Sequence, residues 1–478
     1  MRRRIRIKIM DEDRFFSEED DEVTDLVKQY EAAKANRKSN FFDVSDFESI
    51  INYYIEISNF NKALEVIVQA TKQHPQSTAI QLKKAQVLIE RGQPIKSMKI
   101  LRDIEVLESG NPEFYIIKGT AYSLMGDISK ALKSYNKAVE PDVDNEEEIL
   151  YGIALSLQHQ NFYKESVNFL ERAMHLNPGN NKYLYELGFA YEKMGDLERS
   201  VKLYLNYLDE DPFSENTWFN LGVIYNKLGK KKDALEAFDF TLAVNDENAF
   251  ALFYKANILT DQGKYKEALI EYHDYMKIEY DSIDGFMGMA YCYERLGKYD
   301  LAEKYYREAI AEEPEYAEGW NGLASIAYEI DNFEETIFCL KRAIKLDPDN
   351  SEYQIFLAQV LDLIGEAGGS YNAYKKALEI DPENKDYQLE LAEMLVKNRL
   401  WTETLLELDV EQKENDMSIH NYCYLAIANF GIGNEKKGLF YLDKVLNINP
   451  GIMDTFYIFY SEWKTNTKIG KLIKKYKK

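Results

Sequence analysis

The sequence predicts an all-α solenoid, an array of tandem helix-turn-helix hairpins. Two observations predict it: apolar residues recur with the period of a helix, and the whole pattern returns every 34 residues. The clearest copy is Asn216–Asn245, in which Trp218 and Leu221 share a face of the first helix and Ala234 and Phe238 share a face of the second. A lone hairpin of this size cannot bury both of its apolar faces, so it needs copies of itself as neighbours.

The repeat begins at Val44 and continues through twelve frames. Every step is 34 residues except one of 35, whose extra residue falls in the loop Pro141–Glu148. The frames start at Val44, Thr78, Pro112, Glu147, Asn181, Glu215, Ala249, Ile283, Ala317, Ser351, Lys385 and Ile419. So regular a series predicts a repeat array.

Two positions of the frame hold small residues, where we expect the helices to approach closely while larger neighbours fill the space beside them. The position on the first helix holds Ile51, Ala85, Gly119, Ala154, Gly188, Gly222, Ala256, Ala290, Ala324, Ala358, Ala392 and Ala426. The position that opens the second helix holds Ala63, Ser97, Ala131, Ser166, Ser200, Ala234, Ala268, Ala302, Thr336, Ser370, Thr404 and Gly438.

Glycine and proline mark the helix ends. Just past a helix end the backbone often turns left-handed, which only glycine does cheaply, and proline stops a helix. Glycine stands between the two helices of a frame at Gly92, Gly126, Gly195, Gly229, Gly263, Gly297, Gly365 and Gly433. Proline closes the frame at Pro75, Pro178, Pro212, Pro314, Pro348, Pro382 and Pro450.

This pattern resembles the tetratricopeptide repeat (TPR). The match runs from about Val44 to Pro450 and is close in WFNLGVIYNKLGKKKDALEAF and, from Trp320, in WNGLASIAYEIDNFEETIFCLKRAIKLDP. The frames at Thr78 and Lys385 match least well, and Glu411–Met417 is expected to be an irregular connection. The resemblance implies a right-handed superhelix whose first helices line a concave groove, with protein or peptide binding as the usual activity.

The two ends of the chain differ from the array. We assign residues 1–43 to an acidic, partly flexible segment with a predicted helix from Val23 to about Ala35, residues 44–452 to the twelve-repeat solenoid, and residues 453–478 to a capping helix and a lysine-rich tail. The basic start, MRRRIRIKIM, is either a short strand or a stretch upstream of an initiation site at Met10. The tail Lys464–Lys478 is either a solvated end, an electrostatic contact to an acidic partner, nucleic acid or a membrane surface, or a segment that folds back on the chain's own acidic body.

Charge and cysteine content narrow the function classes. The net charge is −23, and without the basic ends the body carries −35, which argues against nucleic acid and anionic lipid along most of the surface. Three widely spaced cysteines argue against a disulfide framework and favour a reducing, cytoplasmic compartment. No apolar run approaches the ~20 residues that span a bilayer.

No motif predicts catalysis, a cofactor or a metal. The histidines form no pair at metal-ligand spacing, and Cys423 near His420 lacks further ligands. The glycine-rich run Gly365–Ser370 lies between two predicted helices, whereas a phosphate-binding loop follows a strand. Residues outside the repeats are too few for a catalytic domain, so we expect a non-enzyme.

Two activities known among TPR proteins fit this chain poorly. A carboxylate clamp for acidic chaperone C-termini would need lysine and arginine where this chain has Tyr185, Phe250 and Tyr254. The asparagine ladder of TPR-bearing glycosyltransferases is also missing, because the matching column reads Gly152, Glu186, Asn220, Tyr254, Gly288 and Gly322.

What distinguishes the central frames is an aromatic stripe on the first helices, where other frames carry polar or small residues. Such a stripe could dock an extended peptide or a partner helix, with asparagine binding its backbone; alternatively, the rings pack within the solenoid. The residues expected to face the groove are Tyr151, Tyr185, Phe189, Phe219, Asn220, Phe253, Tyr254, Asn257, Met287 and Tyr291.

The sequence therefore predicts a non-catalytic scaffold or adaptor that binds a protein or peptide segment through residues 147–295. The alternative is a nucleic-acid- or ribosome-associated factor anchored by Lys464–Lys478, with the solenoid as a spacer.

Overall fold

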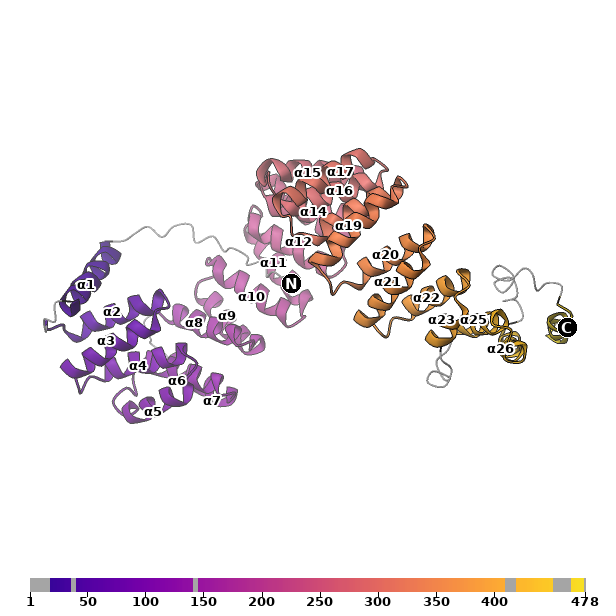
Figure 1. Cartoon of the computed structure of the whole chain (residues 1–478). Helices are drawn as coiled ribbons and strands as arrows, with labels where there is room; N and C mark the ends of the chain where they lie inside the picture. Colours follow the sequence, from indigo (N-terminus) through magenta and orange to yellow (C-terminus); the bar gives the residue numbers. More distant parts are fainter. Residues whose placement is uncertain (1–17, 36–39, 141–144, 409–417, 450–465, 477–478) are drawn as a thin grey trace. The chain divides into compact units, whose positions relative to one another are not determined.

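The computed structural model describes residues 18–35, 40–140, 145–408, 418–449 and 466–476. The described residues form 26 helices and contain no strand, which confirms the all-α prediction. The chain divides into two compact units, Met1–Ala237 and Phe238–Lys478, each of which we describe by itself. Within each unit, successive helices pack as neighbouring hairpins (Figure 1).

The first helices of the hairpins start where the repeat predicts them. Each begins at the predicted residue except α8, which begins one residue early, at Glu146. The first helices are α2 (Val44–Glu56), α4 (Thr78–Glu90), α6 (Pro112–Leu124), α8 (Glu146–His159), α10 (Asn181–Lys193), α12 (Glu215–Lys227), α14 (Ala249–Asp261), α16 (Ile283–Arg295), α18 (Ala317–Glu329), α20 (Ser351–Leu363), α22 (Lys385–Lys397) and α25 (Ile419–Gly431).

The second helices are of similar length with one exception. In the frame that starts at Lys385 the second helix, α23, has only seven residues. The second helices are α3 (Phe60–Gln73), α5 (Pro94–Ile104), α7 (Ile128–Ala138), α9 (Tyr163–Leu176), α11 (Leu197–Glu210), α13 (Lys231–Val244), α15 (Tyr265–Ile278), α17 (Tyr299–Glu312), α19 (Phe333–Leu346), α21 (Ala367–Ile380), α23 (Trp401–Glu407) and α26 (Glu435–Ile448).

The turn inside each hairpin has a left-handed residue at the same position. All eight predicted turn glycines have φ between +66° and +84°. In the other four hairpins that position is held by Ser58, Asn161, Asp331 and Arg399, whose φ values lie between +56° and +66°. The fold therefore requires a left-handed backbone at this position, even in the four hairpins where the residue is not glycine and the conformation is strained.

The two small positions are buried, as the sequence predicts. Every alanine, serine and threonine at these positions has an exposed fraction of 1% or less. The glycines of the first-helix position contact tyrosine: a Cβ added to Gly119 would lie 2.5 Å from the ring of Tyr135, and one added to Gly188 would lie 2.0 Å from the hydroxyl of Tyr204. Small residues therefore make room for large rings on the second helix.

One helix covers the start of the array. Helix α1 (Glu18–Ala35) begins earlier than the predicted Val23 and packs against α2, burying Val27, Tyr30 and Ala33. The hydroxyl of Tyr54 donates a hydrogen bond to Glu31 at 2.5 Å.

Another helix covers the last hairpin. Part of the lysine-rich tail forms α28 (Thr467–Tyr476), which packs against α26 and buries Ile469 completely. Ion pairs join Lys468 to Glu435 at 2.5 Å and Lys475 to Asp443 at 3.2 Å. In the described residues, the tail therefore folds back on the acidic body, one of the three arrangements that the sequence left open.

Several predicted features lie outside the described residues. They are the basic start, residues 141–144 of the loop Pro141–Glu148, the connection Glu411–Met417 and the capping helix expected just after Pro450.

The contact between Gly188 and Tyr204 gives a prediction. Gly188→Ala should force the tyrosine ring to move and lower the free energy of unfolding of its hairpin by about 1 to 3 kcal/mol. The measurement is hydrogen exchange of the α10 and α11 amides. The control is Gly152→Ala in α8, where an added Cβ meets nothing within 4 Å, so alanine should stabilise its helix by about 1 kcal/mol. Equal effects of the two variants would contradict the packing argument.

The turn position gives a second prediction. Ser58 has φ = 56° and is exposed, so Ser58→Gly should relieve backbone strain and stabilise the first hairpin by about 0.5 to 1 kcal/mol. The reverse change in the next hairpin, Gly92→Ser, should cost a similar amount. Hydrogen exchange of the α2–α3 and α4–α5 amides measures both, and the same sign for the two changes would refute the prediction.

The packing of α28 gives a third prediction. Ile469→Asp places a charge in a fully buried site and should detach the helix, so that the amides of residues 467–476 lose their hydrogen-exchange protection. Gly470→Ala is the control, because an added Cβ there meets nothing within 4 Å and alanine favours the helix. If Ile469→Asp kept full protection, the buried contact would not be what holds α28.

Candidate functional site

The five predicted groove residues of the first unit lie on three successive first helices. Tyr151 is on α8, Tyr185 and Phe189 are on α10, and Phe219 and Asn220 are on α12. All five are half-buried, so their side chains are neither in the core nor fully in solvent.

The rings of this unit are supported by neighbouring aromatic and polar groups. Tyr151 lies 5.1 Å from the ring of Tyr183, centroid to centroid, and Phe189 lies 6.0 Å from that of Tyr163. Burial, followed by the charge of Glu186, raises the pKa of Tyr151 to about 12, so its phenol stays neutral. Tyr151 and Phe189 thus pack against a neighbouring ring on one side and keep part of their surface accessible.

The five predicted residues of the second unit lie on α14 and α16. Phe253, Tyr254, Asn257 and Met287 are half-buried, while Tyr291 is exposed to 42%. Phe253 packs against Tyr275 on α15 with a centroid distance of 5.2 Å.

Asn257 does not have the free amide that the sequence suggested. Its Oδ1 accepts a hydrogen bond of 2.6 Å from the hydroxyl of Tyr272, a fully buried residue of α15. One acceptor site of its amide is therefore used within the fold.

Glu186 is a groove residue that the sequence analysis did not single out. It follows Tyr185 on α10, and burial raises the pKa of its carboxyl above the usual range. Its position within the aromatic stripe was visible in the sequence; its lack of a cationic neighbour was not.

Lys255 is a second residue that the sequence analysis missed. It occupies the position held by Leu221 in the neighbouring frame and is only 20% exposed. Burial alone would lower its pKa, but the hydrogen bonds that its ammonium donates to Asp239 at 2.7 Å and Glu271 at 2.9 Å raise it, so the lysine stays charged. A lysine at a normally apolar position was the signal that could have revealed this ion cluster.

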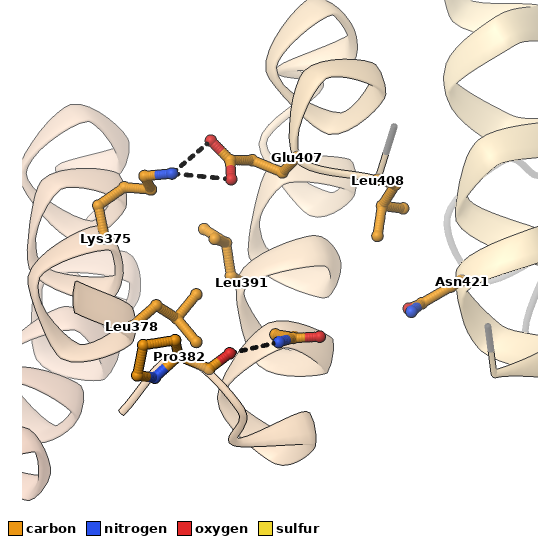
Figure 2. A pocket seen from close by; sticks show the side chains of 8 residues that line it. Lys375, Leu378, Pro382, Leu391, Glu407, Leu408 and Asn421 are labelled. Atoms are coloured by element: carbon orange, nitrogen blue, oxygen red, sulfur yellow. Dashed lines mark hydrogen bonds and ion pairs between the residues drawn. The ribbon is translucent and has the colours of Figure 1, made fainter. Parts of the chain in front are cut away.

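A cavity of about 170 Å³ lies beside the short helix α23 in the second unit. Figure 2 shows Lys375 and Glu407 paired across one side of it, with distances of 3.0 and 3.1 Å from the lysine nitrogen to the two carboxylate oxygens. The Oδ1 atom of Asn421 is buried on the opposite side and has no hydrogen-bond partner among the described residues. The charges of the pair cancel, and the cavity is lined by both polar and apolar side chains.

The cysteines and acids show no metal-binding arrangement. Cys292, Cys339 and Cys423 are buried thiols, and burial raises the pKa of Cys423 to about 12, in agreement with a packing role. Among the described residues, no three histidine, cysteine, aspartate or glutamate side chains are grouped as a metal site requires. Gly365 is a turn residue with φ = +84°, and Gly368 to Ser370 belong to α21, so this run is a hairpin turn as expected.

No helix in the described part of the chain is long and apolar enough to cross a membrane.

Models of the tetratricopeptide repeat match four segments of the chain. They cover residues 112–141, 151–215, 218–280 and 294–360. No curated protein matches the sequence.

Solved structures of similar fold include TPR proteins of low sequence identity. A tetratricopeptide repeat protein from Parabacteroides merdae is 19% identical with a TM-score of 0.42, over 52% of this chain and 98% of that one. A TPR protein from Thermus thermophilus is 23% identical with a TM-score of 0.33, over 38% and 100%. YrrB, a TPR protein described as having an unusual peptide-binding site, is 18% identical with a TM-score of 0.35, over 38% and 95%.

The assignment of this chain combines three observations. Its hairpins repeat every 34 residues, small residues and a left-handed turn recur at fixed positions, and repeat models match segments from residue 112 to residue 360. The chain is therefore a member of the tetratricopeptide repeat family.

Proposed function

We propose that this chain is a cytoplasmic, non-catalytic scaffold or adaptor that binds another protein through the aromatic faces of its central first helices. In the first unit this face consists of Tyr151, Tyr185, Phe189, Phe219 and Asn220. In the second unit it consists of Phe253, Tyr254, Asn257, Met287 and Tyr291. Membership of the TPR family supports a protein-interaction role in general, and the residues of these faces are the specific part of the proposal.

The observation that carries the proposal is the partial exposure of the aromatic side chains. A ring used only for packing is normally buried, as Tyr135 and Tyr272 are, with at most 1% of their surface exposed. The groove rings instead keep accessible surface on helices whose other faces are already packed. Aromatic rings held rigidly at a surface are the side chains that contribute most to protein interfaces.

The alternative, anchoring to nucleic acid or ribosomes through Lys464–Lys478, has less support. Lys468 and Lys475 are paired with acidic residues of α26, and α28 is joined to the array through Ile469. Lys471 and Lys474 on α28 are exposed too, but the chain as a whole carries a net charge of −23, which repels nucleic acid. Deleting the tail should therefore leave the partners of the chain unchanged.

Two matched pairs of substitutions test the proposal. Phe189→Ala and Tyr291→Ala remove groove rings from the first and second unit. Phe213→Ala and Tyr280→Ala remove rings that are 80% and 76% exposed but lie in loops after second helices. We expect partners identified by proximity labelling to be lost with the groove variants and retained with the loop variants, because buried aromatic anchors typically contribute 2 kcal/mol or more.

A melting curve for each variant is the control for folding. Tyr291→Ala is the most informative change, since its exposed ring should leave the midpoint of unfolding nearly unchanged. Full retention of partners by folded groove variants would exclude these faces as the binding surface.

A further inference from the structure

The carboxylate of Glu186 is unusual among the acidic residues of the first helices. Its side chain forms no hydrogen bond or ion pair with any residue that the structure describes. Burial raises the pKa of its carboxyl, and no nearby cation opposes that effect. Placing a carboxylate in such a site costs free energy unless a partner compensates it.

Other carboxylates on the first helices have their partners within the fold. Glu294 accepts hydrogen bonds from Tyr306 at 2.6 Å and Ser325 at 2.7 Å. Glu192 pairs with Lys227 at 2.6 Å. Burial also raises the pKa of Glu48 on α2, but the charge of Lys83 opposes that effect, whereas no described cation opposes it at Glu186.

A glycine leaves open space at the equivalent position of the preceding first helix. Gly152 on α8 stands one frame before Glu186 on α10, and the two helices are joined by a hydrogen bond from Gln158 Nε2 to the carbonyl of Glu186 at 3.2 Å. A Cβ added to Gly152 would meet nothing within 4 Å.

The glycines later in the same column have a packing role that Gly152 lacks. A Cβ added to Gly288 would lie 2.3 Å from the ring of Tyr272, and one added to Gly322 would lie 2.3 Å from that of Tyr306. The corresponding ring before Gly152 is Tyr135, which contacts Gly119 of its own hairpin instead. Glycine at 152 is therefore not required by the core, and its effect is to keep the surface next to Tyr151 open.

Aromatic rings border this opening. Tyr151 is adjacent to Gly152, and its ring lies 5.1 Å from that of Tyr183, which is three residues before Glu186 on α10. Phe189 is one helical turn beyond Glu186 and already has the ammonium of Lys193 5.0 Å from its ring centroid. A carboxylate beside aromatic rings is the environment that attracts lysine and arginine side chains.

We propose that the α8–α10 face binds a lysine or arginine side chain of a partner peptide, with the cation beside Glu186 and its aliphatic part over Gly152 and Tyr151. This inference rests on the proposed function and specifies the chemistry of the partner. The net charge of −23 also favours a basic segment over an acidic one, because it attracts positive charge and repels negative charge.

The test is selection of random dodecapeptides displayed on phage, using the full-length chain as bait. Wild type should enrich peptides with lysine or arginine, and Glu186→Lys should select aspartate or glutamate in their place. For a synthetic peptide from the wild-type selection, Glu186→Gln should weaken binding about tenfold or more, because a charge-assisted hydrogen bond is lost. Gly152→Leu should block the opening and weaken binding to a similar extent.

Two controls separate this effect from a loss of folding or of overall charge. Glu210→Gln removes the same charge from an exposed position near the end of α11 and should bind as wild type does. Melting curves check the fold; because burial disfavours the charged form of Glu186, Glu186→Gln should not lower the midpoint of unfolding.

The outcomes also distinguish this inference from the proposed function. Enriched peptides without basic residues that still require Phe189 would overturn the inference and leave the aromatic groove in place. Equal binding by wild type and Glu186→Gln would do the same. If wild type enriched no peptide at all, both proposals would fail.

Discussion

The contact between a large side chain of the second helix and a glycine of a first helix determines how closely the helices can pack. Tyr135 and Tyr204 each lie against a glycine of their own hairpin, whereas Tyr272 lies against Gly288 in the next hairpin. Each of these three rings lies against a residue without Cβ, because interiors are packed as densely as crystals and a Cβ would take the space of the ring. Where the ring lies against the first helix of the next hairpin, alanine is small enough for the first-helix position of its own hairpin. For these three tyrosines, the place of the glycine therefore indicates toward which first helix the ring points.

Much of the fold was predictable because its signals are local. Helix starts follow from caps, prolines and the 34-residue period, and the turn glycines coincide with left-handed residues. The four turns without glycine, such as the one at Arg399, were harder to recognise because their residue types do not reveal the backbone conformation. The short helix α23 and the cluster of Lys255 with Asp239 and Glu271 depend on neighbours in other helices, which a single frame does not contain.

The sequence predicts which residues of the candidate site lie on the first helices, but not which of their polar groups are free to bind a ligand. The period places Tyr185, Phe189 and Asn257 on the first helices, and the structure places them there. Whether a group is available depends on second-helix side chains: the hydroxyl of Tyr272 donates a hydrogen bond to the carbonyl of Asn257, and no described side chain pairs with the carboxylate of Glu186. The sequence therefore indicates which residues share a surface, while the contacts decide which of them can bind.

The direction of the Tyr135 ring links the interior of the first unit to the recognition surface that we propose. Because the ring occupies the space above Gly119, the surface at Gly152 stays vacant. A larger residue at 119 would displace the ring, whose hydroxyl already lies 3.4 Å from Ser156 of α8, and so change the packing beneath this surface without altering any surface residue. In a repeat protein, selectivity can therefore change through substitutions that no partner touches, and closely related chains with identical surfaces need not share ligands.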